Sequence, residues 1–124
     1  MYGVKVVLGA TTAAKVDASF AVLEIDLIRV KGKAEPETVF TLLGDDTVRS
    51  SPEFKTLAHP HAEMIARYRA KDWDGADAAL IACREPGRAL GMSGLYDLYA
   101  ERIAAFRAEA PPPDWGGVYV ALSK

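Results

Sequence analysis

The fold is decided by one stretch, Asp26-Leu-Ile-Arg-Val-Lys-Gly-Lys-Ala-Glu-Pro-Glu37. A mainly apolar run, residues 20–31, leads into it, and a second run, residues 38–43, leads out of it. Two such runs around a short polar connection predict a β-hairpin, and Gly32 can adopt turn conformations that other residues avoid. Pro36 prevents a helix in the connection. We therefore expect two antiparallel strands joined at Gly32.

Alternation along the first strand places charge at one end of this hairpin. Counted in twos, Leu23, Ile25 and Leu27 share one face. Arg29 and Lys31 continue that face, so their charges are expected at the rim of a buried surface. A lysine held there can bind phosphate as a compact cation. The residues alone leave a second interpretation open, in which lysines beside a turn are simply solvated.

The hairpin resembles that of a known family. Similarity to the closing hairpin of class III nucleotidyl cyclases, the adenylate and guanylate cyclases, lies in Val30-Lys31-Gly32-Lys33 and in Val39-Phe40-Thr41-Leu42. Upstream, Tyr2-Gly3-Val4-Lys5-Val6-Val7-Leu8 is similar to the strand before the last cyclase helix, and Thr11-Thr12-Ala13-Ala14-Lys15-Val16 is similar to that short helix. The resemblance covers residues 2 to about 44 and keeps the order of these elements.

This resemblance implies a role in making cyclic nucleotides from nucleoside triphosphates. In the family the first lysine of the motif, here Lys31, contacts the β- and γ-phosphates. Two divalent cations, Mg²⁺ or Mn²⁺, are held by aspartates upstream of the matching region, so no catalytic or metal-binding residue is assigned here. The chain is expected to be a C-terminal segment that is inactive by itself. Its expected partners are the rest of the catalytic domain or a second copy, in a homodimer or a domain swap.

Composition narrows the class of protein. The 124 residues are 50% hydrophobic and 26% charged, as in an ordinary globular protein that forms one domain or two very small ones. The net charge of −2 creates no field that favours nucleic acid. No apolar run is long enough for a membrane span, and no signal-peptide pattern is seen. A single cysteine excludes an internal disulfide, and a cytoplasmic location is expected.

We expect an α+β fold in four parts. Residues 1–44 form the end of the ferredoxin-like cyclase domain, a partial antiparallel sheet with strands near 3–8, 20–31 and 38–43 and a short helix near 11–16. The other parts are a linker (45–52), a three-helix unit (53–110) and an extended Pro/Trp tail (111–124). Within the tail, residues 118–122 suit either a final strand or an arm on the helices.

The spacing of apolar residues and the positions of proline and glycine predict the helices of the helical unit. Apolar residues recur at three and four from Phe54, and Pro60 favours a helix start near His59. Further helices are expected over 74–84, ended by Pro86-Gly87, and over 94–108. The turn Tyr68-Arg69-Ala70-Lys71-Asp72-Trp73-Asp74-Gly75-Ala76 resembles that of a tetratricopeptide repeat. It implies either a helical lid or, as the alternative function, a non-catalytic protein-interaction module contacting partners through Tyr68 or Trp73.

The remaining candidate side chains fit structural roles better than functional ones. His59 and His61, with Glu63 nearby, offer too few ligands for a metal and fit a helix start. Cys83 lies on an alanine-rich helical face and is expected in the core. Turn and capping roles are expected for Asp45, Asp46, Asp72 and Asp74. Solvated helix faces are expected to carry the scattered cations Arg67, Arg69, Lys71, Arg102 and Arg107.

Overall fold

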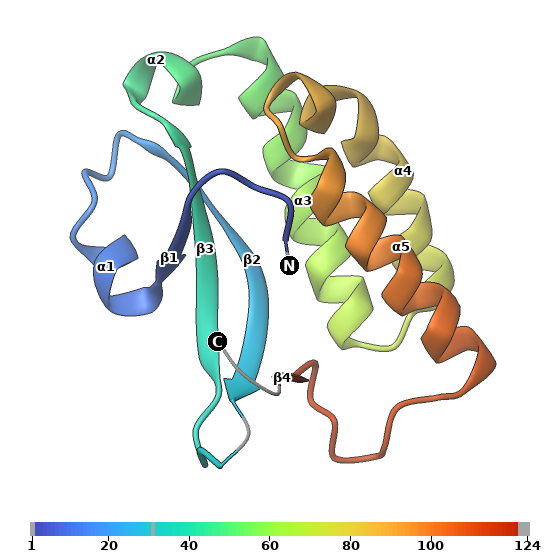
Figure 1. Ribbon diagram of the computed structural model, residues 1–124. Helices are drawn as coiled ribbons and strands as arrows, with labels where there is room; N and C mark the ends of the chain where they lie inside the picture. Colours follow the sequence, from blue (N-terminus) through green and yellow to red (C-terminus); the bar gives the residue numbers. More distant parts are fainter. Residues whose placement is uncertain (1, 31, 122–124) are drawn as a thin grey trace.

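The computed structural model describes residues 2–30 and 32–121 and has an α+β fold, as expected. Lys31 lies outside the described residues. Figure 1 shows the sheet on one side of the molecule and a layer of three long helices packed beside it. The elements in chain order are β1 (Val7–Gly9), α1 (Ala10–Ala14), β2 (Ala21–Val30), β3 (Glu37–Gly44), α2 (Asp46–Arg49), α3 (Pro52–Arg69), α4 (Trp73–Ala89), α5 (Ser93–Ala108) and β4 (Tyr119–Ala121).

The four described strands form a mixed sheet in the order β1-β3-β2-β4. The predicted hairpin is confirmed, because β2 and β3 pair antiparallel, as do β1 and β3. Of the two arrangements open for residues 118–122, the strand is confirmed: β4 joins the sheet parallel to β2. The antiparallel sheet inferred from the hairpin thus gains a parallel edge from the other end of the chain (Figure 1).

The first strand, Val7–Gly9, is shorter than the strand predicted near 3–8 and overlaps it only at residues 7 and 8. The chain turns at Gly3, which has φ +67° and packs so closely on Gly94 that an added Cβ would lie 2.8 Å from its Cα. The backbone carbonyl of Val6 accepts a 2.7 Å hydrogen bond from the Thr41 hydroxyl in place of a strand partner. Packing against α5 therefore takes the place of strand pairing here.

A β-bulge interrupts β2 and overturns the expected alternation. In the β2–β3 ladder Glu24 lies opposite Phe40, but the next pair is Asp26 with Val39, so Ile25 is an extra residue. An extra residue exchanges the two faces for everything that follows it. The prediction that Leu27 shares a face with Leu23 is therefore wrong.

The first long helix, α3, begins at Pro52 and not near His59. The Ser51 hydroxyl caps it by accepting a 3.2 Å hydrogen bond from the Phe54 amide, and Pro52 occupies the first turn, where its missing N–H costs nothing. Burial of Phe54 and Leu57 keeps the first two turns helical in spite of Pro60 inside the helix. Tertiary packing here outweighs the local effect of one proline.

The other two long helices are close to expectation. Of the two expected cap residues, Asp72 and Asp74, it is Asp72 that caps α4, because its carboxylate accepts a 3.0 Å hydrogen bond from the Gly75 amide. Pro86 does not end α4, which continues to Ala89. The third helix of the unit, α5, covers the predicted range almost residue for residue. In addition, the region expected as a linker holds the short helix α2, capped by Asp45.

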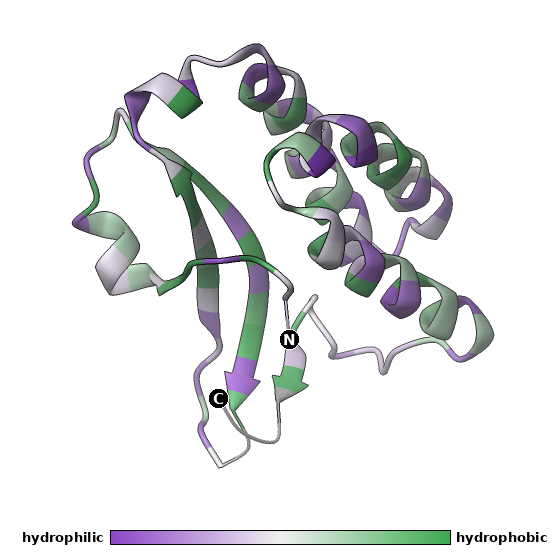
Figure 2. Ribbon diagram, turned by 45° about the horizontal axis from the view of Figure 1, so that its top comes forward, coloured by the Kyte–Doolittle hydropathy of each residue, from purple (hydrophilic) through white to green (hydrophobic). Residues whose placement is uncertain are grey.

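One hydrophobic core joins the sheet to the helical unit. It contains Ile25 and Val39 from the sheet, Leu57 and Tyr99 from the helices, and Trp115 from the tail. Figure 2 shows hydrophobic segments recurring along both hairpin strands and along the three helices. None of the described helices combines the length and the apolar character that crossing a membrane requires.

Candidate functional site

The turn of the hairpin has the geometry that its sequence predicts. Gly32 has φ +92°, a left-handed conformation that favours glycine, and the Lys33 amide donates a 3.0 Å hydrogen bond to the Val30 carbonyl. Arg29 and Lys33 are both exposed. The described part of the hairpin end therefore presents at least two cations, one on either side of the position of Lys31.

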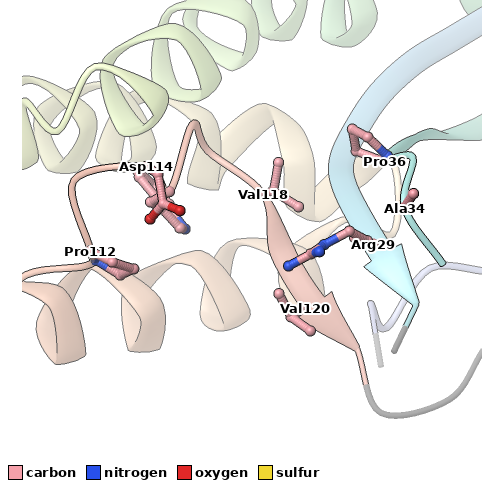
Figure 3. Close-up of a pocket in the computed structure, with 8 residues that line it drawn as sticks. Arg29, Ala34, Pro36, Pro112, Asp114, Val118 and Val120 are labelled. Carbon is pink, nitrogen blue, oxygen red and sulfur yellow. The ribbon is translucent and has the colours of Figure 1, made fainter. Parts of the chain in front are cut away.

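A cavity of about 300 Å³ lies between this hairpin end and the C-terminal tail. Figure 3 shows the Arg29 side chain directed toward the tail segment that carries Val118 and Val120. Asp114 supplies the other charge, while prolines from both segments and Trp115 complete an otherwise apolar lining. The bulge explains this placement, because it turns Arg29 away from the face that Leu23 shares with Asp26.

The bulge itself is held by side chains of the helical layer. His61 of α3 contacts the Glu24 carbonyl through Nε2 at 2.6 Å. The Tyr99 hydroxyl of α5 donates a 2.6 Å hydrogen bond to the next carbonyl, that of Ile25. An extra residue in a strand disrupts the ladder, so its polar groups need other partners. These two side chains provide them.

A buried ion pair fixes the third residue of the bulge. Arg102 of α5 donates from Nη1 and Nη2 to the two carboxylate oxygens of Asp26, each at 3.0 Å, and the two side chains are only 6% and 1% exposed. Tyr2 donates a further 2.9 Å hydrogen bond to this carboxylate. The Tyr119 ring of β4 lies 4.2 Å from the centre of the guanidinium. We call His61, Tyr99 and Arg102 the bulge clamp.

Burial and the charge of Asp26 shift the pKa values of Arg102 and Tyr2. Burial lowers the pKa of Arg102, but hydrogen bonds and attraction from Asp26 outweigh burial and leave the pKa above its usual value. Burial, followed by the charge of Asp26, raises the pKa of the Tyr2 phenol. Both groups therefore keep their protons, and the arrangement is a fixed salt bridge rather than a proton-transfer site.

The expectation that Arg102 lies on a solvated helix face is wrong. A carboxylate buried in β2 is costly unless a cation and hydrogen bonds compensate it, and Arg102 is the cation within reach. A sequence signal did exist. Asp26 interrupts an apolar run, and Arg102 falls one turn beyond Tyr99 and next to Ile103, both expected in the core.

His61 is a neutral histidine with both ring nitrogens engaged. A carbonyl can only accept, so Nε2 carries the proton that is donated to Glu24, and Nδ1 accepts from the Tyr96 hydroxyl at 2.8 Å. Burial lowers the pKa of His61, opposed by the nearby Glu24, whose carboxylate pairs with Arg69 at 2.6 Å. Cys83 lies beyond Tyr96, and burial raises its pKa to about 11.

The side chains considered as metal ligands or as contacts for a partner have the following positions in the structure. No three His, Cys, Asp or Glu side chains gather as a metal site within residues 2–30 and 32–121. His59 is exposed on α3, whereas His61 points into the core. Cys83 is buried, as predicted. Tyr68 and Trp73 pack together with ring centroids 5.9 Å apart, in a cluster with Phe106 and Trp115.

Comparison with protein-family models, with curated proteins and with solved structures gave no match to this chain.

Replacing Arg102 by leucine is expected to lower the free energy of unfolding by about 3–5 kcal/mol, because Asp26 would stay buried without its cation. Urea denaturation measures this. The control is Arg67→Leu, which removes ion pairs to Glu63 and Asp72 on an exposed helix face and should cost much less, because solvent screens exposed pairs. Equal losses in the two variants would contradict the role given to the buried pair.

The lowered pKa of His61 predicts a pH-dependent stability. As the pH falls below about 6.5, the usual histidine pKa, the unfolded chain takes up a proton that folded His61 resists. The free energy of unfolding should therefore fall between about pH 7.5 and pH 5.5, by at most about 1.4 kcal/mol per pH unit. His61→Gln, which keeps a donor and an acceptor, should flatten this dependence.

His59 provides the matched control, since it is exposed on the same helix. His59→Gln should keep the wild-type pH profile of unfolding. A profile that is flattened by His59→Gln and kept by His61→Gln would show that the buried ring is not the titrating group.

Proposed function

We propose that the chain is the C-terminal segment of a class III nucleotidyl cyclase homologue that acts in the cytoplasm and forms a cyclic nucleotide from a nucleoside triphosphate. One observation carries the proposal: a strand, a short helix and an antiparallel hairpin follow one another in the order of the resemblance. The hairpin turns at Gly32 in the middle of Val30-Lys31-Gly32-Lys33.

Lys31 is the residue to which the proposal assigns a contact with the substrate. Its ammonium group would neutralise charge on the β- and γ-phosphates, the part of the substrate that leaves as pyrophosphate. Arg29 and Lys33, exposed near it, support an anion-binding role for this end of the hairpin. The proposal gives the chain a phosphate-binding part and leaves the choice between ATP and GTP to residues upstream.

The described residues do not fit the divalent cations, Mg²⁺ or Mn²⁺, that a complete cyclase requires. They contain no cluster of three or more potential ligands. The buried carboxylate of Asp26 is occupied by Arg102 and Tyr2. We therefore assign no metal-dependent step to this chain and propose that it works with the rest of a catalytic domain, being inactive alone.

The edge of the sheet supports pairing with another segment. Within the described strands β1 is bonded only to β3, and Val6 and Val7 are 38% and 51% exposed. An open apolar edge invites a further strand. We propose that this edge pairs with the remainder of the catalytic domain or, in isolation, with a second copy through a dimer or domain swap.

The helical unit is proposed as a packed layer of the same fold. The alternative function, a protein-interaction module, relied on Tyr68 and Trp73. Tyr68 is 1% exposed and Trp73 is half-buried, with its ring stacked on Phe106 at 5.4 Å. These contacts support a structural role for both residues.

Replacing Lys31 by alanine tests the proposed function. Loss of one charge-assisted phosphate contact should weaken binding of ATP or GTP by about 1.5–3 kcal/mol, which is about tenfold to 150-fold. Titration of the folded chain followed by amide NMR shifts measures weak affinities of this kind. Lys55→Ala removes an exposed lysine from α3 and should leave the affinity unchanged. Identical titrations of Lys31→Ala and wild type would refute the assignment.

The open β1 edge predicts self-association. Light scattering across the micromolar range should show a mass that rises toward that of a dimer. Val7→Lys should keep the chain monomeric, because a lysine on an edge strand disfavours pairing. The control is Ile81→Lys, which removes exposed apolar surface from α4, away from the sheet. A wild-type chain that is monomeric throughout would argue against an unpaired edge.

A further inference from the structure

The bulge in β2 decides which face each later residue of the strand occupies. Beyond Ile25, the residues that share a face with Val39 and Glu37 are Asp26 and Ile28. Ile28 packs on the core, while Arg29 lines the cavity beside the tail. A continuous strand without the bulge would exchange these faces all the way to Val30, the residue before Lys31.

Pairing with β3 does not by itself hold the bulge at Ile25. Backbone hydrogen bonds in a ladder are indifferent to side chains, and register is normally set by which face is buried. Here the buried face carries a carboxylate, Asp26, which favours water unless it is paired. The contacts that hold the bulge at Ile25 must therefore come from outside the hairpin.

The helical layer makes such contacts with three consecutive residues of β2. His61 contacts the carbonyl of Glu24, Tyr99 that of Ile25, and Arg102 the side chain of Asp26. In a regular strand successive side chains point to opposite faces and successive carbonyl groups to opposite neighbours. One layer of helices can therefore satisfy three neighbouring residues in this way only where the strand is bulged.

We infer that the three-helix unit sets the register in which β2 delivers the hairpin end that carries Arg29 and Lys33, with His61, Tyr99 and Arg102 as positioning residues for that end. The inference rests on the proposed function of Lys31 and adds a role for the helices, which lie more than twenty residues further along the chain. Displacing the clamp would leave the hairpin folded but would free its bulge to move.

Tyr99→Phe tests this with the smallest change, because it removes one hydroxyl and keeps the ring that packs on Tyr68 at 4.9 Å. Amide hydrogen exchange by NMR should become about fivefold faster in residues 27–30 and 37–40, the effect of one lost neutral hydrogen bond. The affinity for inorganic tripolyphosphate should fall by a similar factor. Amides of α4 serve as the internal reference.

Two matched comparisons separate positioning from general stability. Tyr68→Phe removes a hydroxyl that lies near the Arg102 guanidinium in the same aromatic cluster but donates to no described carbonyl of β2, and should leave hairpin exchange relative to α4 unchanged. His61→Gln keeps a donor for the Glu24 carbonyl and should bind tripolyphosphate as wild type does. His61→Leu lacks that donor and should behave like Tyr99→Phe.

The outcomes distinguish the inference from the function on which it rests. If Lys31→Ala binds tripolyphosphate as well as wild type, the proposed function fails and the positioning role fails with it. If binding depends on Lys31 but Tyr99→Phe leaves either hairpin exchange or affinity at the level of Tyr68→Phe, only the positioning role is overturned.

Discussion

The carboxylate of Asp26 is the constraint around which this structure is organised. It is almost completely buried, and its charge is matched by Arg102, which lies 76 residues later in the chain. The pair draws in Tyr2 from the N-terminal segment through a hydrogen bond, and Tyr119 from β4 through its ring. Buried pairs of this kind contribute little net stability compared with apolar residues, but they penalise every arrangement in which one partner is left alone. Their main effect is therefore to select one arrangement of four segments.

This selection explains why the sheet and the helices form one unit. The clamp contacts three successive residues of β2 from two helices, and the same helices share a core with β2, β3 and the tail. A helical appendage joined by a loose linker would leave the hairpin to set its own register. In this fold the geometry of the hairpin end, with exposed Arg29 and Lys33, depends on contacts made by α3 and α5.

The sequence predicts the helices and strands of this fold better than it predicts their register and their packing against one another. The hairpin around Gly32, the cap at Asp72 and the last helix follow from turn residues, a capping side chain and apolar spacing, which act locally. The bulge was not predictable in this way, because Glu24 and Asp26 on either side of Ile25 make the alternation from Leu23 to Leu27 regular and give no sign of where it breaks. Pro60 and Pro86 were misleading for a similar reason, since packing of the helix face overrides one missing hydrogen bond. The partner of Asp26 was foreseeable only from the rule that a charge in a buried strand needs an opposite charge.

Measuring the register of the hairpin tests most directly whether the helices hold a bulge in β2. NMR of the wild-type chain gives it through nuclear Overhauser contacts between backbone protons of facing residues in β2 and β3. We predict contacts that join Glu24 to Phe40 and Asp26 to Val39, with Ile25 unpaired between them. Contacts that join Ile25 to Val39 and Leu27 to Glu37 would describe a continuous ladder. They would contradict the claim that the helices hold a bulge and thereby aim the end of the hairpin.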